Sequence, residues 1–225
     1  MSFRFKQFSI EDSKCAMKVG TDGVLLGAWA PKGTRILDIG TGSGLIARML
    51  MQRCPEAEVE GIDIDETAVE QARANGVRAF HARLQDWRPE RPYDLIVSNP
   101  PYFQNSLKNP DKGRQTARHT DTLSYEELIR HSARLLQEHG QLALILPADA
   151  EDEVCRLATS MQFSLTRITR VYSKVSKPVR RVLLLFEIIG ARDHEITTAE
   201  DSLVLENETG GRSAAYSELC KEFYL

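Results

Sequence analysis

Short apolar runs alternate with segments of helical spacing through most of the chain. In sequence order these are an apolar run at 35–40, a helical pattern at 44–54, an apolar run at 59–65, a helical pattern at 65–75, apolar runs at 77–82 and 94–99, a helical pattern at about 124–138, and an apolar run at 141–147. Asp65 is placed to cap the second of these helices. This alternation predicts an α/β fold, with parallel strands joined by crossover helices.

The two ends of the chain follow other patterns. After a further helical segment, residues 163–173 and 180–189 are β-rich with no strong helical pattern between them, so we expect an antiparallel pair there. The segment before residue 35 predicts a strand and a helix capped by Thr21 or Asp22. We expect a single domain, divided into a lead-in at 1–34, a core at 35–147 and a C-terminal part of the sheet at 148–225.

Composition limits the compartment and the kind of site. No segment of the 225 residues resembles a signal peptide, and the longest apolar run, VLLLF at 182–186, is far too short to cross a bilayer. The four cysteines lie apart without CxxC spacing, which argues against a zinc site and a disulfide framework and fits a reducing cytoplasm. The five histidines show no paired spacing, so we expect no metal site.

Charge is distributed unevenly, although the formal net charge is only −3. Residues 154–186, here called the basic stretch, hold no acidic residue, whereas residues 190–225 hold eight acidic and three basic ones. The seven cations of the basic stretch are Arg156, Arg167, Arg170, Lys174, Lys177, Arg180 and Arg181. Such a stretch predicts a basic face that meets phosphates. The alternative is a strand edge that Lys and Arg protect from aggregation.

The first chemical signal is DIGTGSG at 38–44, here called the glycine loop, which follows an apolar run and precedes a helical pattern. Its glycines let the backbone turn tightly and let a ligand approach the helix N-terminus. The loop departs from the dinucleotide fingerprint GxGxxG, because Leu45 stands at the third glycine position. Asp63, at the end of the next apolar run, suits the ribose hydroxyls of NAD and of S-adenosylmethionine equally well.

The apolar run PYDLIVSNPPYF ends in Asn99, two prolines and two aromatic residues, which cannot extend a sheet ladder. Asp86 precedes this run in LQDW. The glycine loop, an acidic residue ending the second strand, Asp86 and NPPY, in that order, resemble the amino-directed branch of the class I S-adenosylmethionine-dependent methyltransferases. The resemblance implies a Rossmann-like α/β fold with a seven-stranded, mostly parallel sheet, an antiparallel C-terminal pair and helices on both faces.

The resemblance also implies what NPPY does. An exocyclic amine conjugated to a ring or a carbonyl is a poor nucleophile, so acceptors must hold its two hydrogens and turn its lone pair toward the methyl group. The family pattern gives this task to the Asn99 side chain and the Pro100 carbonyl. Pro101 stiffens the turn, and Tyr102 stacks on the planar target. The methyl donor is already activated, so positioning is the main contribution of the protein.

Cofactor contacts are implied by position in the same pattern. Asp38 is expected to reach the methionine amino group through water, Asp63 to hold the ribose hydroxyls, and Asp86 to accept from the adenine amine. The full set of expected cofactor contacts is Thr21, Asp38, Gly40, Thr41, Gly42, Gly44, Asp63, Ile64, Asp86 and Asn99.

The ends of the chain narrow the target of methylation. NPPY occurs in enzymes acting on adenine, on the guanine exocyclic amine and on glutamine side chains, but the glutamine enzymes carry a helical domain for which the residues before Ile36 leave no room. FRFKQF, CAMKVGTDGVLLGAWA, RRVLLLF and YSELCKEFYL resemble the bacterial methyltransferases that modify adenine N6 beside the anticodon, at position 37, of a valine tRNA. The resemblance implies that activity, with a guanine amine in ribosomal RNA or a protein glutamine as alternatives.

Residues 104–118 do not match that family residue by residue, but their composition suits RNA. Phe103 offers a stacking surface, and basic side chains here and in the basic stretch are expected to meet phosphates. These expected phosphate contacts are Lys108, Lys112, Arg114, Arg118, Arg180 and Arg181. The alternative is a surface loop without a role in binding.

Two other classes of protein share part of the pattern. An NAD-dependent dehydrogenase would share the fold, but the sequence shows no hydride-site motif and NPPY would be unexplained. A non-catalytic RNA-binding module would not require Asn99. We therefore expect S-adenosylmethionine as cofactor and tRNA as partner, with no membrane, no metal and no obligate protein partner.

Overall fold

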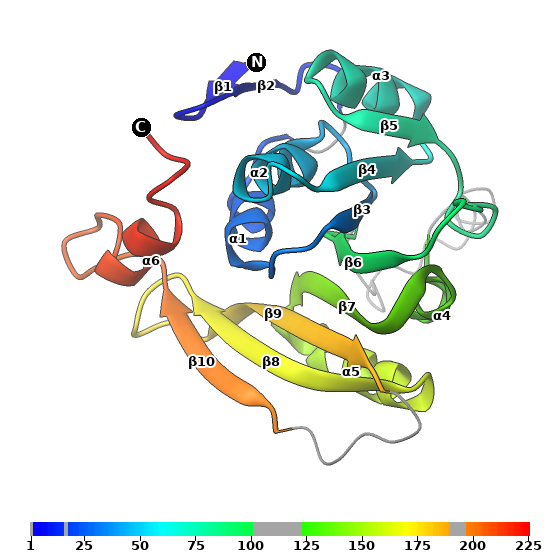
Figure 1. Ribbon diagram of the computed structural model, residues 1–225. Helices are drawn as coiled ribbons and strands as arrows, with labels where there is room; N and C mark the ends of the chain where they lie inside the picture. The colour runs from blue at the N-terminus through cyan, green and yellow to red at the C-terminus, as the bar shows by residue number, and fades with distance from the viewer. Residues whose placement is uncertain (1, 16–17, 101–122, 190–196) are drawn as a thin grey trace, which may run out of the picture.

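Eight strands form one mixed sheet with helices against it (Figure 1). The structure, a computed structural model, describes residues 2–15, 18–100, 123–189 and 197–225. The strand order in the sheet is β10-β8-β9-β7-β6-β3-β4-β5. The strands are β3 Arg35–Ile39, β4 Glu58–Asp63, β5 Arg78–His81, β6 Tyr93–Ser98, β7 Leu136–Pro147, β8 Phe163–Tyr172, β9 Val179–Ile188 and β10 Ala199–Val204.

Strand directions agree with the predicted alternation. The pairs β3–β4, β3–β6, β4–β5 and β6–β7 are parallel, and β9 runs antiparallel to both β7 and β8. The chain builds the sheet outward from β3 through β4 to β5 and then returns to the other side of β3 with β6. This reversal is a topological switch point, where the carboxyl ends of parallel strands leave a crevice. The expected antiparallel C-terminal pair is β8 and β9.

The prediction of seven strands is one short. The eighth, β10, pairs in parallel with β8, from Ala199 opposite Arg167 to Val204 opposite Tyr172. Its sequence, AEDSLV, is largely exposed at the sheet edge, and only Leu203 is buried. A strand with a single buried position lacks the apolar pattern by which strands are recognised in a sequence.

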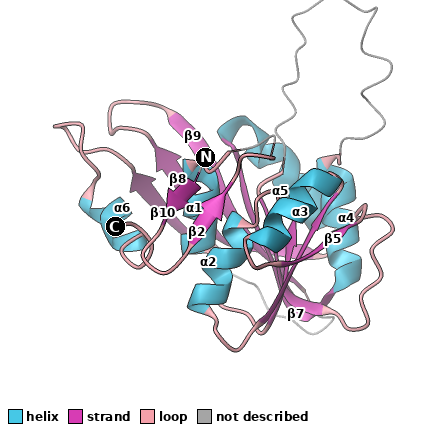
Figure 2. Cartoon of the chain, turned by 90° about the horizontal axis from the view of Figure 1, so that it is seen from above, coloured by secondary structure: helices cyan, strands magenta, loops and turns pink. Residues whose placement is uncertain are grey.

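Helices cover both faces of the sheet, which explains the nearly continuous apolar runs (Figure 2). On β7, Ala143 and Ile145 belong to one core cluster, whereas Leu142, Leu144 and Leu146 belong to the other. The first cluster includes residues of α1 Thr21–Trp29, α2 Leu45–Arg53 and α3 Glu66–Ala74, and the second includes residues of α4 Tyr125–Leu135 and α5 Glu151–Ser160. A short 3-10 turn at Ala148–Ala150 precedes α5. Within the described ranges, no helix is long and apolar enough to cross a membrane.

Helix starts were predicted with mixed success. Asp65 caps α3 as expected, because its Oδ1 accepts from the backbone amide of Thr67 at 2.9 Å. The prediction that Thr21 or Asp22 caps α1 was wrong, because the N-cap is Gly20 and no side chain in the described part of the chain caps that end. Thr21 and Asp22 belong to the first turn of the helix itself, so their side chains are available for other contacts.

The fourth helix also ends earlier than predicted. The helical pattern extended to about residue 138, but α4 ends at Leu135 and β7 begins at the next residue. Gly140, two residues beyond the predicted end of the helix, lies inside β7. A Cβ at that position would stand 2.8 Å from the carbonyl oxygen of Gln137, so glycine is required by a close approach of the backbone.

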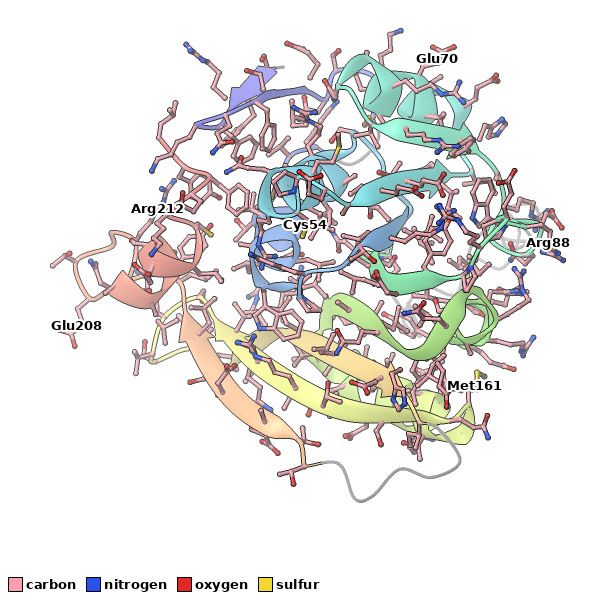
Figure 3. The ribbon with its side chains drawn as sticks, in the orientation of Figure 1. Cys54, Glu70, Arg88, Met161, Glu208 and Arg212 are labelled. Atoms are coloured by element: carbon pink, nitrogen blue, oxygen red, sulfur yellow. The ribbon has the colours of Figure 1, made fainter. Side chains whose placement is uncertain are left out.

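The two ends of the chain pack together. A two-stranded hairpin, β1 Ser2–Arg4 and β2 Ser9–Glu11, lies beside the segment that follows α6 Ala214–Leu219 (Figure 1). The backbone amide of Lys6 donates to the Phe223 carbonyl at 2.8 Å, and the rings of Phe5 and Tyr224 stack with centroids 6.1 Å apart. The guanidinium of Arg212, which is labelled in Figure 3, lies over the Tyr224 ring, 3.8 Å from its centroid.

Candidate functional site

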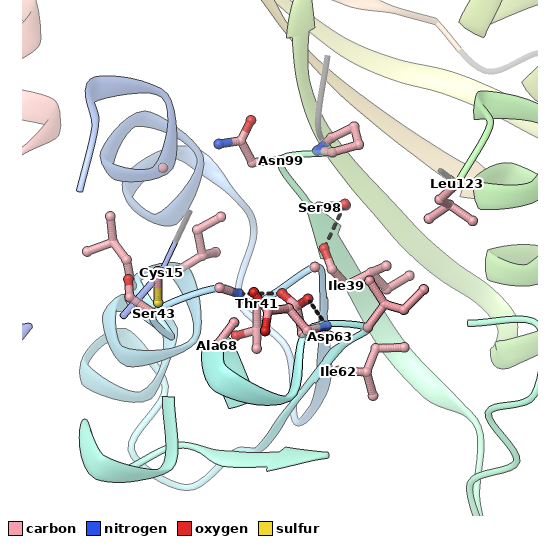
Figure 4. A pocket seen from close by; sticks show the side chains of 18 of the residues that line it. Cys15, Ile39, Thr41, Ser43, Ile62, Asp63, Ala68, Ser98, Asn99 and Leu123 are labelled. Carbon is pink, nitrogen blue, oxygen red and sulfur yellow. Dashed lines mark hydrogen bonds between the residues drawn. The ribbon is translucent and has the colours of Figure 1, made fainter. Parts of the chain in front are cut away.

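A cavity of about 760 Å³ opens at the carboxyl ends of β3, β4 and β6, at the topological switch point (Figure 4). Its lining comes from segments far apart in the sequence. These are residues of the N-terminal segment before α1, the first turn of α1, the glycine loop, the end of β4, the segment 83–85, the end of β6, and the region where α4 begins. The fold therefore brings together the motifs that the sequence separates.

The glycine loop is shaped by left-handed backbone. Gly40, Gly42 and Gly44 have φ angles of 70°, 54° and 80°, and residues other than glycine rarely adopt such positive φ angles. Gly40 and Gly42 line the cavity, and a Cβ on either would meet essentially open space. Gly44 does not line the cavity, since a Cβ there would stand 2.7 Å from a methyl carbon of Val77. Two of the three predicted glycines thus form the cavity floor, and the third permits close packing.

Asp38 lies under the glycine loop and is fully buried. Its Oδ2 accepts from the Thr41 hydroxyl at 2.7 Å and from the Ala47 amide at 3.3 Å, while Oδ1 has no partner within the described residues. Burial away from water raises the pKa of this carboxyl to about 7, against the opposing effect of the two hydrogen bonds. Asp38 is not among the residues that line the cavity, whereas Thr41 is.

Asp63 ends β4 and lines the cavity. Its Oδ2 accepts from the Gly42 amide at 2.9 Å, and its Oδ1 accepts from the Asp65 amide at 2.9 Å. Each carboxylate oxygen can accept further hydrogen bonds, so the half-buried group can hold the loop and still serve a ligand. The next residue, Ile64, also lines the cavity with 48% of its surface exposed.

Asn99 and Pro100 line the cavity directly after β6 (Figure 4). Ser98 fixes the end of that strand, because its buried hydroxyl donates to the carbonyl of Ile39 at 2.8 Å. The strand that ends in the glycine loop and the strand that ends in NPPY are therefore tied together at the cavity. Several predicted residues lie outside the described part of the chain, namely Pro101, Tyr102, Phe103, Lys108, Lys112, Arg114 and Arg118.

Asp86, the residue predicted to contact adenine, lies next to the cavity lining but is not part of it. Asp86 is exposed and does not line the cavity, whereas its neighbour Gln85 does. The Gln85 amide donates to Oε1 of Glu127 at 3.2 Å, and Glu127 also lines the cavity. Hydrogen bonds from the Ser124 amide, from Gln85 and from the Ser124 hydroxyl lower the pKa of Glu127, so it is a carboxylate at neutral pH. The pair forms a polar end of the cavity.

Arg181, predicted as a phosphate contact, pairs with a carboxylate at the cavity. Its Nε donates to Oδ2 of Asp22 at 2.8 Å, and both Asp22 and Thr21 line the cavity. Arg180, by contrast, is exposed. The structure therefore separates two neighbouring arginines that the sequence grouped together.

The basic face predicted from the sequence is partly neutralised. Because β10 lies beside β8, the acidic end of the chain pairs with the basic stretch. The ion pairs with this acidic end are Arg167 with Asp201, Arg170 with Glu200 and Lys174 with Glu206, and Arg170 also pairs with Glu151 of α5. Sequence counting did not detect this cancellation, because it depends on a strand that the sequence pattern did not reveal.

Sequence reasoning missed several residues of the cavity. Lys18 and Cys15 come from the N-terminal segment, and Glu127 forms a capping box with Ser124 at the start of α4. The S-x-x-E pattern at 124–127 was a readable signal for that box. For Cys15, Lys18 and Gln85 there was no signal beyond their neighbourhood to motifs. Among the described residues, no group of three or more His, Cys, Asp or Glu is arranged to hold a metal ion.

The chain is similar in sequence to known methyltransferases. Residues 14–165 match the family described as methyltransferase small domain. A Bacteroides fragilis protein named tRNA1(Val) (adenine(37)-N6)-methyltransferase is 45% identical over 236 residues, which cover 99% of this chain and 97% of that protein.

Solved structures share the fold at lower identity. A predicted O-methyltransferase from Agrobacterium tumefaciens is 19% identical, with a TM-score of 0.69 over 90% of this chain and 96% of that chain. A T. thermophilus 16S rRNA N2 methyltransferase in complex with AdoMet and guanosine is 20% identical, with a TM-score of 0.56 over 84% of this chain and 50% of that chain.

Proposed function

The chain belongs to the family of tRNA1(Val) (adenine(37)-N6)-methyltransferases, and we propose that it transfers a methyl group from S-adenosylmethionine to the exocyclic N6 amine of adenine 37 in a valine tRNA. One observation carries this proposal beyond the family: the glycine loop, Asp63 and the Asn99–Pro100 turn border a single cavity. A cofactor bound at the first two sites lies next to an amine bound at the third.

The cavity fits this cofactor. A volume of about 760 Å³ is within the range of pockets that enclose ligands of this size. The open space above Gly40 and Gly42 leaves room for a ligand to pass close to the backbone. Asp63 has acceptor capacity for two ribose hydroxyls, and Ile64 offers apolar surface to a purine ring. Because Asp38 is buried and does not line the cavity, its unpartnered Oδ1 would reach the cofactor's amino group only through a water, as predicted from the sequence.

S-adenosylmethionine, when bound, supplies a methyl group on a positively charged sulfur, which leaves as a neutral thioether. The contribution of the chain is to orient the acceptor. In this proposal the side-chain oxygen of Asn99 and the carbonyl of Pro100 accept the two hydrogens of the N6 amine, which directs the nitrogen lone pair toward the methyl group. An amide does not titrate near neutrality, so Asn99 orients the amine and does not act as a base. The nitrogen takes up the positive charge that the sulfur loses, and it then releases one proton to solvent.

The identity of the target rests on the relatives. The B. fragilis protein at 45% identity is named for adenine N6, whereas the rRNA enzyme that acts at an N2 position is only 20% identical. Methylation of a guanine amine or of a protein glutamine is therefore not favoured. Because tRNA is the proposed substrate, we assign the reaction to the cytoplasm.

The direct test is methyl transfer from radiolabelled S-adenosylmethionine to total tRNA that lacks this modification, followed by nucleoside analysis. We expect N6-methyladenosine as the labelled product. Label in N2-methylguanosine, or in protein and not in RNA, would overturn the proposal. In parallel, S-adenosylmethionine and S-adenosylhomocysteine should raise the melting temperature, and NAD should not.

A further inference from the structure

Asn75 connects two segments that are distant from it in the sequence. It ends α3, does not line the cavity, and is half-buried. Its side-chain Nδ2 donates to the carbonyl of Glu11 at 2.8 Å and to the carbonyl of Ser43 at 2.8 Å, and its Oδ1 accepts from the amide of Glu11 at 3.0 Å. Both donors and one acceptor site of a single amide are thus used on the backbone of β2 and of the glycine loop.

The contact with Glu11 reaches the cavity through the next residue of the chain. Asp12 is buried, and its Oδ2 accepts from the Val19 amide at 3.0 Å, while its backbone carbonyl accepts from the Lys18 ammonium at 2.7 Å. The same carbonyl accepts from the Cys15 amide at 3.2 Å. Cys15 and Lys18 line the cavity, so the end of β2 anchors the N-terminal part of its wall.

The contact with Ser43 reaches the cavity directly. Ser43 is a buried residue of the glycine loop and lines the cavity beside Gly42. Without Asn75, the Ser43 carbonyl would lose this hydrogen-bond donor. The loop backbone around it is already constrained by positive φ angles. One side chain outside the cavity therefore fixes the position of two parts of the cavity wall relative to each other.

We propose that Asn75 is a positioning residue for the cofactor, because it holds the N-terminal wall and the glycine loop at the separation that S-adenosylmethionine requires. This inference rests on the proposed function for the identity of the ligand. The loop alone provides only the floor of the cavity. The affinity for S-adenosylmethionine then depends on the wall being in place before the cofactor binds. If the wall became ordered only on binding, the entropic cost would reduce the affinity.

The chemistry of the side chain makes the inference testable with a nearly isosteric change. Asn75→Asp keeps the size and shape but replaces two N–H donors with lone pairs that face the carbonyl oxygens of Glu11 and Ser43. The added negative charge by itself would favour a cationic ligand. Weaker binding of S-adenosylmethionine would therefore reflect the lost hydrogen bonds. Asn207→Asp is a matched control, because Asn207 mainly accepts, from the amides of Thr209 and Gly211, and does not line the cavity.

The experiment measures S-adenosylmethionine binding by calorimetry and steady-state kinetics with tRNA for wild type, Asn75→Asp, Asn75→Ala and Asn207→Asp. We expect the Kd and the KM for S-adenosylmethionine to rise about tenfold in Asn75→Asp and less in Asn75→Ala, as expected for one or two lost hydrogen bonds. kcat at saturating cofactor and KM for tRNA should stay within about twofold of wild type. Asn207→Asp should match wild type.

The outcomes separate this inference from the proposed function. Unchanged affinity for S-adenosylmethionine in both Asn75 variants, with or without a lower melting temperature, would make Asn75 a structural cap and overturn the inference. A fall in kcat without a rise in KM would also overturn it. If Asn75→Asp does not fold, Asn75→Ala decides by the same measurements. A wild-type protein that binds S-adenosylmethionine but methylates no tRNA would refute the proposed function and leave the affinity comparison valid.

Discussion

Arg181 on β9 and Asp22 in the first turn of α1 form an ion pair, with Nε and Oδ2 separated by 2.8 Å. The side chains are 29% and 24% exposed, so the pair is shielded from water for most of its surface. It fixes the edge of the cavity where α1 begins. Arg181, which the sequence predicts as an RNA contact, thus pairs with a residue that lines the cavity, and its neighbour Arg180 is exposed.

Separate substitution of these two arginines should affect different properties of the protein. Arg181→Ala should lower the free energy of unfolding by about 2 kcal/mol and weaken S-adenosylmethionine binding, because the Asp22 charge loses a close partner. Arg180→Ala should leave both unchanged, weaken tRNA binding and flatten the log-log salt dependence by about one unit. Melting curves and tRNA binding across a salt series measure these effects. An unaltered salt slope in Arg180→Ala would remove Arg180 from the RNA interface.

Asn99→Ala should separate catalysis from cofactor binding. The change deletes the amide oxygen proposed to hold the amine but leaves the glycine loop and Asp63 intact. We expect kcat to fall at least about a hundredfold, which corresponds to about 3 kcal/mol of transition-state stabilisation, while the Kd for S-adenosylmethionine changes by less than about threefold. Single-turnover kinetics with unmodified tRNA is the measurement. Wild-type turnover in this variant would mean that other groups orient the amine.

Asp63→Asn should act on the cofactor and not on the amine. One of the two carboxylate oxygens becomes an N–H donor facing a backbone amide, either that of Gly42 or that of Asp65. We expect the Kd for S-adenosylmethionine to rise between about tenfold and a hundredfold, since hydrogen bonds to a charged acceptor contribute about 1.5–3 kcal/mol. kcat at saturating cofactor should be nearly preserved. Calorimetric titration of the variant tests this, and an affinity equal to wild type would exclude Asp63 as a ribose contact.

Substitutions at residues 85 and 86 should decide which one serves the adenine end. Gln85 lines the cavity and Asp86 does not, so Gln85→Ala should weaken S-adenosylmethionine binding about fivefold, as for one lost hydrogen bond. Asp86→Ala should bind with wild-type affinity. The reverse pattern would restore the role that the sequence assigned to Asp86.

Asp38 should make stability depend on pH. Burial raises its pKa from 3.8 to about 7, so between these values the folded protein retains a proton that the unfolded chain has released. The free energy of unfolding should therefore fall as pH rises from about 4 to about 7, and this contribution should be constant above and below that window. Asp38→Asn cannot titrate and should lack this component. Urea unfolding of both proteins across that range gives the difference, and a constant difference would show that Asp38 is charged throughout.

The sequence was most informative where a pattern has a local cause. Buried parallel strands are apolar on both faces, the glycine loop needs positive φ, and Asp65 caps its own helix, so these features were predictable from neighbouring residues. The order of motifs also placed Asp63 and Asn99 at the carboxyl ends of strands that meet at the cavity.

The sequence was least informative where a residue acts across long separations. β10 is a strand because β8 lies beside it. The partners of Arg167 and Arg170 on β10 lie 34 and 30 residues away in the sequence. Asp38 and Asp63 have the same side chain and lie near the carboxyl ends of neighbouring parallel strands, yet one is enclosed under the loop and the other faces the cavity. This difference in burial depends on tertiary packing, so the pattern of apolar and polar residues in the sequence does not predict it.

The contacts between the N-terminal hairpin and the segment after α6 have a consequence for the order of folding. Lys6 donates to the carbonyl of Phe223, and Phe5 stacks on Tyr224, so the hairpin that precedes the N-terminal wall of the cavity has partners more than two hundred residues away. Contacts between residues so far apart in sequence cost loop-closure entropy before they stabilise the fold. We therefore expect the central parallel strands to form first, and the N-terminal wall of the cavity to be fixed late in folding.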